Sequence, residues 1–241
     1  MALRILGVIP ARYHSKRFPG KILFEIKGKP LIQWVYEGAK RSRLIDRLII
    51  ATDDDRIAEC ARGFGAEVFI SRRRHKCGSE RVAEAAAELN YAIVVNIQGD
   101  EYSIHPETVR AAVNAVKSDT KAWCGTVAFP LKNVSDIKNA DLVKVVVDKH
   151  KNALYFSRST IPHDAENKTG RTQYFGHIGV YAFRNKYLQK FAGLKQMPLE
   201  KAEKLEQLRI LEHGGKIIVA ITKIKTISIN RRTDIRTLSK Y

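Results

Sequence analysis

Short hydrophobic runs alternate with helix-type patterns over the first hundred residues of the chain. The runs predict buried strands at residues 5–9, 48–51, 68–70 and 93–97. Apolar positions spaced three and four residues apart predict helices at residues 30–40, 57–64 and 79–89, with Asp53 and Ser79 as N-caps of the second and third. This alternation is typical of a mainly parallel sheet covered by helices on both faces, which binds its ligands at the carboxyl ends of the strands.

The second half of the chain has a different pattern. Two apolar segments, 143–147 and 154–156, flank a polar turn and predict a hairpin, and further strands are predicted at 178–183, 217–221 and 227–229. A helix is predicted at 199–213, closed by Gly214-Gly215, and a short one from about Thr233. The polar segment 163–172 is predicted to be a loop. Because no repeat, low-complexity tract or linker interrupts the sequence, we expect one domain over residues 1–241.

The chain is strongly basic, with 43 Lys and Arg against 25 Asp and Glu and a net charge of +18. Such a surface attracts anions, so nucleic acid, an acidic membrane face and small anionic substrates all fit. The basic residues are spread along the sequence, and only Arg72-Arg73-Arg74 forms a dense run. The charge alone therefore favours no partner.

No apolar stretch approaches the ~20 residues that a membrane helix needs, and the first residues lack the features of a signal peptide. We therefore expect a cytoplasmic location and no membrane partner. Three cysteines, Cys60, Cys77 and Cys124, are too few and too scattered for a disulfide framework or a metal site. Gly20-Lys21 lacks the other residues of a Walker A loop, and Gly63-Phe64-Gly65 precedes a strand, so neither common nucleotide motif is present.

A basic loop, PARYHSKRFPGK at residues 10–21, leaves the end of the first predicted strand. Its cations Arg12, Arg17 and Lys21 could wrap a triphosphate and stabilise pyrophosphate as a leaving group. Asp100 follows a Gln-Gly pair at the end of another predicted strand, where a carboxylate suits a Mg²⁺ ion that bridges phosphate oxygens. A solvated loop and a turn cap explain these two patterns equally well, so the spacing alone leaves both interpretations open.

Eight sequence blocks, spread over nearly the whole chain, form a recognisable series: PARYHSKRFPGK, ATDDDRI, GSERVAEA, VVNIQGDE, VKVVVD, ALYFSRSTIP, HIGVYAFR and LEQLRILEHG. Together and in this order, they resemble the CMP-Kdo synthetases, also called 3-deoxy-manno-octulosonate cytidylyltransferases. The first and fourth blocks are shared more widely with nucleotide sugar transferases. ALYFSRSTIP, HIGVY and LEQLR are typical of the Kdo branch.

The resemblance implies a three-layer α/β/α sandwich with a mainly parallel mixed sheet, which works as a homodimer with Mg²⁺. The implied reaction is attack of the Kdo anomeric hydroxyl on the α-phosphorus of CTP, giving CMP-Kdo and pyrophosphate for lipopolysaccharide synthesis. Residues from about 130 to 215 are expected to contain the dimerisation and sugar-acid region. Nucleic acid is not expected as a partner.

The motifs also imply site residues in four groups. Arg12, Ser15, Arg17 and Lys21 would hold the triphosphate. Thr52, Asp53, Ser79, Arg81 and Gln98 would surround the cytidine. Tyr155, Arg158, His177, Glu206 and Gln207 would line the sugar-acid pocket. Asp100 and Asn230 would face the metal, and Arg12, Arg17, Lys21 and Asp100 are the expected catalytic residues. Without the resemblance, Tyr155 would be interpreted as a core residue and His177 as a strand histidine with an internal partner.

Three positions depart from the family pattern. Ser79 stands where threonine is usual but keeps the hydroxyl, and Tyr102 replaces a proline after QGDE. Asn230 replaces a metal carboxylate and has the cation Arg231 beside it. The hypotheses therefore rank as a Kdo cytidylyltransferase, then a cytidylyltransferase for 8-amino-Kdo or a sialic-acid-like sugar, then a weakened nucleotide-binding homologue. A nucleic-acid binder driven by charge ranks last.

Overall fold

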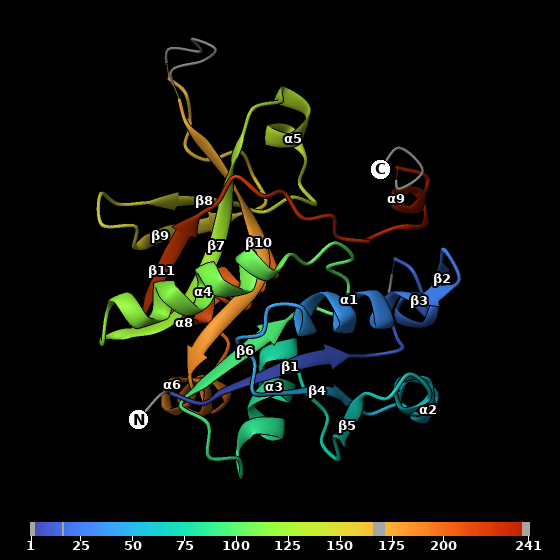
Figure 1. Ribbon diagram of the computed structural model, residues 1–241. Helices are drawn as coiled ribbons and strands as arrows, with labels where there is room; N and C mark the ends of the chain where they lie inside the picture. Colours follow the sequence, from blue (N-terminus) through green and yellow to red (C-terminus); the bar gives the residue numbers. More distant parts are fainter. Residues whose placement is uncertain (1–2, 16, 166–171, 238–241) are drawn as a thin grey trace. The chain divides into compact units, whose positions relative to one another are not determined.

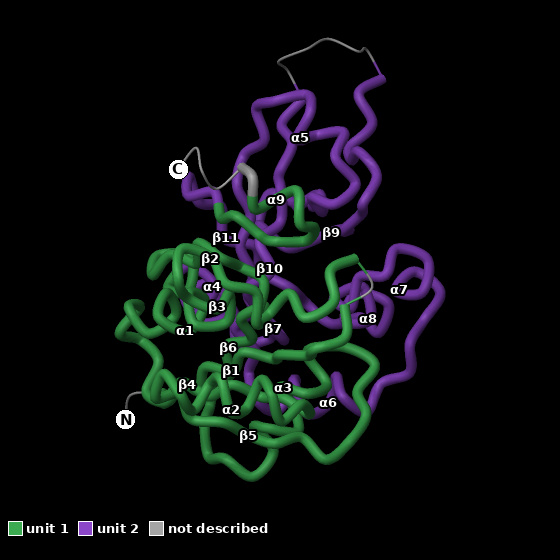
Figure 2. The backbone as a smooth tube through the Cα atoms, turned by 90° about the vertical axis from the view of Figure 1, so that its right-hand side faces the viewer, with its two compact units in different colours: residues 1–110, 226–241 green, residues 111–225 purple. Residues whose placement is uncertain are grey.

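The computed structural model describes residues 3–15, 17–165 and 172–237. The chain forms two compact units (Figure 2). Unit 1 comprises residues 1–110 and 226–241, and unit 2 comprises residues 111–225. The expectation of one domain over 1–241 stays a prediction, and the segment expected to contain the sugar-acid region lies within unit 2.

Unit 1 contains a parallel sheet of four strands (Figure 1). β1 (Ile5–Ala11) pairs with both β4 (Arg47–Thr52) and β6 (Ile93–Ile97), and β4 pairs with β5 (Glu67–Ile70). β1 and β6 are almost wholly buried, as continuous apolar runs require. Because all four strands run in the same direction, the segments that follow β1, β4 and β6 leave the sheet at one edge.

Three main helices accompany this sheet: α1 (Leu31–Lys40), α2 (Asp55–Gly63) and α3 (Gly78–Ala86). The shorter elements are η1 (Lys21–Leu23), β2 (Glu25–Ile26), β3 (Lys29–Pro30) and α9 (Arg232–Thr237). The four predicted strands of this unit and the helices between them are confirmed.

Both predicted N-caps in unit 1 are wrong. Asp54, not Asp53, caps α2, because its Oδ1 accepts a hydrogen bond from Arg56 N at 3.1 Å. Cys77 is the N-cap residue of α3 and makes no side-chain cap bond, so Ser79 lies inside the first turn. The strand predicted at 227–229 is also absent there, since Ser228 forms only an isolated bridge with Glu101.

Unit 2 is built on β7 (Ala122–Leu131), which pairs in parallel with β11 (Lys216–Ile221) and antiparallel with β10 (Tyr174–Arg184). The predicted hairpin is confirmed as β8 (Lys144–Val147) and β9 (Ala153–Ser157). A Cβ on Gly125 would lie 2.4 Å from Ala112 O, so only glycine lets β7 approach the neighbouring helix this closely. Together with unit 1, these pairings confirm the predicted α/β class with a mainly parallel mixed sheet.

The helices of unit 2 include α5 (Val134–Lys138) and α6 (Asn185–Ala192), while α4 (Pro106–Ser118) begins in unit 1 and continues in unit 2. The single helix predicted at 199–213 is wrong, because α7 (Pro198–Glu203) and α8 (Leu208–Glu212) replace it. The break lies at Lys204, whose φ of 56° is left-handed. A buried ion pair of 2.7 Å between Glu200 and Arg209 holds the two helices together.

The predicted loop 163–172 lies partly outside the described residues, which omit 166–171. Across the described ranges, no helix combines the length and apolar character needed to cross a membrane.

Candidate active site

A pocket of about 100 Å³ opens in unit 1 at the carboxyl ends of β1 and β6. Its lining combines five of the predicted site residues with three neighbours: Arg12, Ser15, Lys21, Gln98 and Asp100, with Pro10, Ile22 and Gly99. A Cβ on Gly99 would lie 3.1 Å from Pro10 O, so a larger residue would crowd the approach of the two strand ends. The parallel pairing of β1 with β6 is what brings the basic loop and the QGD segment together.

Lys21 is the most enclosed cation of this pocket. Its Nζ donates to Asp100 Oδ2 at 2.6 Å and to Ile229 O at 2.9 Å. Gly20, with φ of 68°, makes the turn into η1 that carries Lys21. The C-terminal segment is held at the same place, because Ile229 N donates to Asp100 O at 2.9 Å. Lys21 therefore joins the two chain segments that carry the predicted metal-facing residues.

Arg17 is exposed, and its Nη2 donates to Asn230 Oδ1 at 2.9 Å. The backbone N–H groups of Asn230 and Arg231 both donate to Asp234 Oδ2 at 2.7 Å, which fixes the turn before α9. The Asn230 oxygen thus faces a cation where the family pattern has a carboxylate.

The oxygen donors at this edge fit Mg²⁺ in number and type. Among the described residues, no cluster of three or more His, Cys, Asp or Glu side chains could hold a metal. However, Mg²⁺ in nucleotide enzymes is usually held by one or two carboxylates plus substrate phosphates and water. Asp100 offers one carboxylate that is partly exposed, and Asn230 offers an amide oxygen.

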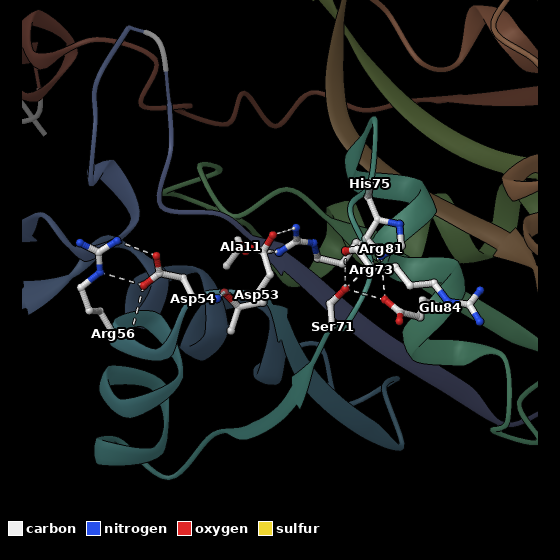
Figure 3. A network of polar contacts seen from close by, with 10 residues as sticks. Ala11, Asp53, Asp54, Arg56, Ser71, Arg73, His75, Arg81 and Glu84 are labelled. Carbon is white, nitrogen blue, oxygen red and sulfur yellow. Dashed lines mark hydrogen bonds and ion pairs between the residues drawn. The ribbon is translucent and has the colours of Figure 1, made fainter.

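A second polar group lies where β4 ends and α3 begins (Figure 3). Arg81 is buried and grips Asp53 with two bonds of 2.6 and 2.7 Å, while its Nη1 also donates to Ala11 O at 2.9 Å. The hydrogen bonds from Arg81 lower the pKa of Asp53, which stays ionised at neutral pH. Arg81 therefore ties the ends of β1 and β4 to α3.

The other predicted cytidine residues have internal partners. Thr52 is fully buried, and its Oγ1 accepts from Asp54 N at 3.2 Å. Ser79 Oγ accepts from Asn96 Nδ2 at 2.9 Å, and Gln98 Nε2 donates to Asn96 Oδ1 at 3.4 Å. Thr52 ends β4, and Ser79 lies on α3 with Arg81. Gln98 follows β6 and also lines the pocket.

A cluster of Ser71, His75 and Glu84 was not predicted from the sequence (Figure 3). Ser71 Oγ donates to Glu84 Oε2 at 2.5 Å, and His75 Nε2 lies 2.7 Å from the same oxygen. The Ser71 hydroxyl therefore donates its hydrogen to the carboxylate, whereas a serine activated by a histidine base would donate to the imidazole. The cluster instead holds the segment between β5 and α3.

In unit 2, His177 lies between the rings of Phe156 and Tyr181 on β9 and β10. Its Nε2 is 2.9 Å from Thr126 Oγ1, which donates its own hydrogen to Val180 O at 2.8 Å. We therefore assign the ring proton to Nε2, so Nδ1 is an acceptor. Burial lowers the pKa of His177 to about 3, and the ring is neutral at neutral pH.

Arg158 follows β9, and Glu203 of α7 contacts both its backbone N–H and its side chain. Arg158 N donates to Glu203 Oε2 at 2.9 Å, and Arg158 Nε donates to Glu203 O at 3.0 Å. Tyr155 is half-buried, and its pKa is raised by burial and by Glu203. The structure thus brings Tyr155 and Arg158 to the same carboxylate.

The two remaining predicted sugar-acid residues precede α8. Gln207 is buried, whereas Glu206 is half-buried. Sequence reasoning missed Glu203 and also Lys144, which is fully buried in β8. The signal for Lys144 was its position inside the apolar run VKVVV, because a lysine that is buried in such a run needs polar partners.

Comparisons with known proteins identify the family of the chain. The family model described as cytidylyltransferase matches residues 6–222, which defines the class as a nucleotidyltransferase. The 3-deoxy-manno-octulosonate cytidylyltransferase of Syntrophobacter fumaroxidans is 46% identical over 97% of this chain and 94% of its own length. The protein of the same name from Geobacter metallireducens is 41% identical over 97% of this chain and 95% of its own.

A solved structure of CMP:2-keto-3-deoxy-manno-octonic acid synthetase complexed with CTP has the same fold. It superimposes with a TM-score of 0.90 at 33% identity, covering 98% of this chain and 97% of that one. The chain therefore belongs to the cytidylyltransferase family and, within it, to the 3-deoxy-manno-octulosonate cytidylyltransferases, or CMP-Kdo synthetases. The resemblance expected from the sequence is confirmed.

Proposed function

We propose that this chain transfers CMP from CTP to the anomeric hydroxyl of 3-deoxy-manno-octulosonate, giving CMP-Kdo and pyrophosphate for lipopolysaccharide synthesis. The observation that carries the proposal is the pocket that joins the basic loop to Asp100, in a chain related over nearly its full length to enzymes of that name. The sugar oxygen forms a bond to the α-phosphorus while the bond from that phosphorus to the pyrophosphate oxygen breaks. The proton of the attacking hydroxyl passes to solvent water.

The basic loop binds the triphosphate. Arg12, Arg17 and Lys21 supply positive charge to the β- and γ-phosphates, and Ser15 adds a hydroxyl donor. Charge develops on pyrophosphate as it leaves, so cations held at that position lower the barrier. Pocket lining by Arg12, Ser15 and Lys21 supports these roles.

Asp100 and Asn230 would hold Mg²⁺ together with phosphate oxygens and water. When bound, the ion neutralises phosphate charge. Lys21 holds the Asp100 carboxylate in place until the substrate arrives, since it donates to Oδ2 from an enclosed position.

The cytidine is bound by Thr52, Asp53, Ser79, Arg81 and Gln98. Within this group, Gln98 offers an amide that can both donate to and accept from a base, and it lies beside the phosphate pocket. Arg81 and Asp53 form the rigid floor of this subsite, because their bidentate pair is also tied to β1.

The sugar acid is bound by Tyr155, Arg158, His177, Glu206 and Gln207. A guanidinium matches a carboxylate with two parallel hydrogen bonds, so Arg158 pairs with the acid group. His177 is neutral and accepts a hydrogen bond from a sugar hydroxyl through Nδ1, given the tautomer set by Thr126.

By the same resemblance, we propose that the chain works in the cytoplasm as a homodimer. The homodimer is tested by the mass of the purified protein in solution. One further functional candidate has an observation in its favour. A weakened nucleotide-binding homologue would suit the pairing of Asn230 with Arg17, because Asn230 brings a neutral amide oxygen to the position proposed to face the metal.

The decisive experiment measures pyrophosphate release with CTP, Mg²⁺ and Kdo, each omitted in turn. We expect release only in the complete mixture. Replacing Kdo by 8-amino-Kdo or a sialic acid identifies the preferred sugar. Binding of CTP with no release for any of the three sugars would show a weakened homologue and overturn the proposal. Salt-sensitive binding to any DNA duplex without release would identify the chain as a nucleic-acid binder.

A further inference from the structure

Lys144 is a cation with no solvent exposure at the start of β8. Its Nζ donates to three backbone carbonyl oxygens, those of Asn139 at 2.9 Å, Leu142 at 2.8 Å and Arg158 at 2.6 Å. An ammonium group has three hydrogens, so this set uses all of them. The lysine joins the loop before β8 to the residue that follows β9.

The arrangement is unusual because all three acceptors are carbonyl groups and none is a carboxylate. Burial and the nearby charge of Arg158 lower the pKa of Lys144, while Glu203 opposes this effect. A buried charge without an ionic partner is costly, and an apolar side chain would fill an apolar strand position at lower cost. The hydrogen bonds to the carbonyls are therefore the reason for a lysine at this position.

Arg158 is the residue that these bonds fix. Lys144 holds its carbonyl oxygen, while Glu203 Oε2 accepts from its N–H at 2.9 Å. Glu203 Oε1 also accepts from Ser157 Oγ at 2.5 Å, which fixes the preceding residue. The main chain of Arg158 is thus held on both sides by charged groups.

The guanidinium is then directed by two further carbonyls. Nε donates to Glu203 O at 3.0 Å, and Nη1 donates to Ala140 O at 3.2 Å. Ala140 lies between Asn139 and Leu142, the two other residues whose carbonyls Lys144 holds. The same ammonium therefore fixes both the backbone that carries Arg158 and the loop that accepts from its side chain. Among the described residues, Nη2 of Arg158 has no hydrogen-bond partner.

We propose that Lys144 is a positioning residue for sugar-acid binding, which acts by holding Arg158 where its guanidinium meets the substrate carboxylate. This inference rests on the function proposed above and names a residue that acts through Arg158 without touching substrate. Two parallel hydrogen bonds to a carboxylate demand a guanidinium placed within about 0.5 Å. Loss of the hydrogen bond to the backbone of Arg158 therefore weakens the binding of the sugar acid and leaves CTP binding unchanged.

The test compares Lys144→Met with Lys149→Met, a matched change at an exposed lysine in the β8–β9 turn. Pyrophosphate release is measured with Kdo varied at saturating CTP, and then with CTP varied at saturating Kdo. For Lys144→Met, we expect the KM for Kdo to rise about ten- to a hundredfold, the range seen when a supporting contact is lost. The KM for CTP should stay within about twofold of wild type, and Lys149→Met should change neither constant.

A double-mutant cycle with Arg158→Ala distinguishes positioning from general damage. If Lys144 acts through Arg158, Lys144→Met adds at most about twofold to the KM for Kdo once Arg158 is absent, because coupled residues are not additive. Additive losses, or an equal rise in the KM for CTP, would overturn the inference. A selective effect in the milder Lys144→Gln supports it if the methionine variant fails to fold. Failure of both to fold would show a purely structural lysine.

The cycle also separates this inference from the proposed function. If Arg158→Ala raises the KM for Kdo but Lys144→Met does not, only the role of Lys144 is wrong. If Arg158→Ala leaves the KM for Kdo unchanged, the assignment of Arg158 to the sugar carboxylate falls, and the inference falls with it.

Discussion

Lys21 and Asp100 form an ion pair of 2.6 Å that lies at the centre of the candidate active site. The lysine side chain is 10% exposed and the aspartate side chain 28% exposed, so the carboxylate is the member that faces outward. Lys21 also donates to Ile229 O, which anchors the segment that carries Asn230. A single ammonium group therefore links the two chain segments that are proposed to hold the metal.

Because of this pair, Asp100→Asn is a sharper test than truncation to alanine. The amide keeps an oxygen for Lys21, so the fold should remain intact, but it removes the negative charge proposed to hold Mg²⁺. We expect kcat to fall by at least about a hundredfold, since metal stabilisation of phosphate charge contributes several kcal/mol. Thermal unfolding should stay close to wild type. Asp55→Asn, at an exposed position on α2, is the control, and an unchanged kcat in folded Asp100→Asn would contradict the assignment.

Arg17→Ala should weaken the binding of CTP far more than the binding of CMP, because the proposed partner of Arg17 is the β- or γ-phosphate that CMP lacks. A charge-assisted hydrogen bond contributes about 1.5–3 kcal/mol, so we expect a difference of that size between the two nucleotides in calorimetric titrations. Arg62→Ala, at another exposed arginine of unit 1, should affect neither nucleotide. Equal losses for CTP and CMP would mean that Arg17 does not contact the terminal phosphates.

The sequence predicts the outline of the site because its parts follow strongly buried strands. The apolar runs at 5–9 and 93–97 become β1 and β6, and their parallel pairing brings Lys21 to Asp100. The bond between Arg17 and Asn230 has no local signal, since it joins residues 213 positions apart. The break between α7 and α8 cannot be predicted from the sequence either, because the helical pattern of apolar residues continues across it. The buried ion pair between Glu200 and Arg209 favours two short helices in place of one.

His177 is expected to make the free energy of unfolding depend on pH in the acidic range. Its folded pKa of about 3 lies below the ordinary value near 6.5, so between these values the unfolded chain binds the extra proton. The contribution of the neutral ring is complete above about pH 6.5 and is lost as the pH falls toward 3. We expect the free energy of unfolding of wild type, relative to His177→Gln, to fall by on the order of 2 kcal/mol from pH 6.5 to 4.5.

Urea denaturation at several pH values measures this difference directly. His150→Gln, in the exposed β8–β9 turn, is the matched control and should follow the wild-type pH dependence. If wild type and His177→Gln lose stability in parallel as the pH falls, then His177 takes up its proton in the folded state and its folded pKa is not lowered.

Asn230 is the position where two roles compete. As a metal ligand it would bring an oxygen without charge, whereas in the structure that oxygen accepts a hydrogen bond from Arg17. Asn230→Asp should tighten Mg²⁺ if the residue faces the ion, and we expect the magnesium requirement at saturating CTP to fall about ten- to a hundredfold, by analogy with supporting contacts at metal sites. The measurement is a magnesium titration of pyrophosphate release.

Asn230→Ala separates the two roles, because it removes the oxygen from both partners. A ligand role predicts that the magnesium titration shifts to higher concentrations with little change in CTP affinity measured without metal. A role confined to holding Arg17 predicts the opposite result: Asn230→Ala reproduces the loss of CTP affinity of Arg17→Ala, and both Asn230 variants titrate with magnesium as the wild type does. That second result would remove Asn230 from the metal site and leave Asp100 as its carboxylate, with the Arg17 cation oriented by a neutral acceptor that keeps its full charge available to the triphosphate.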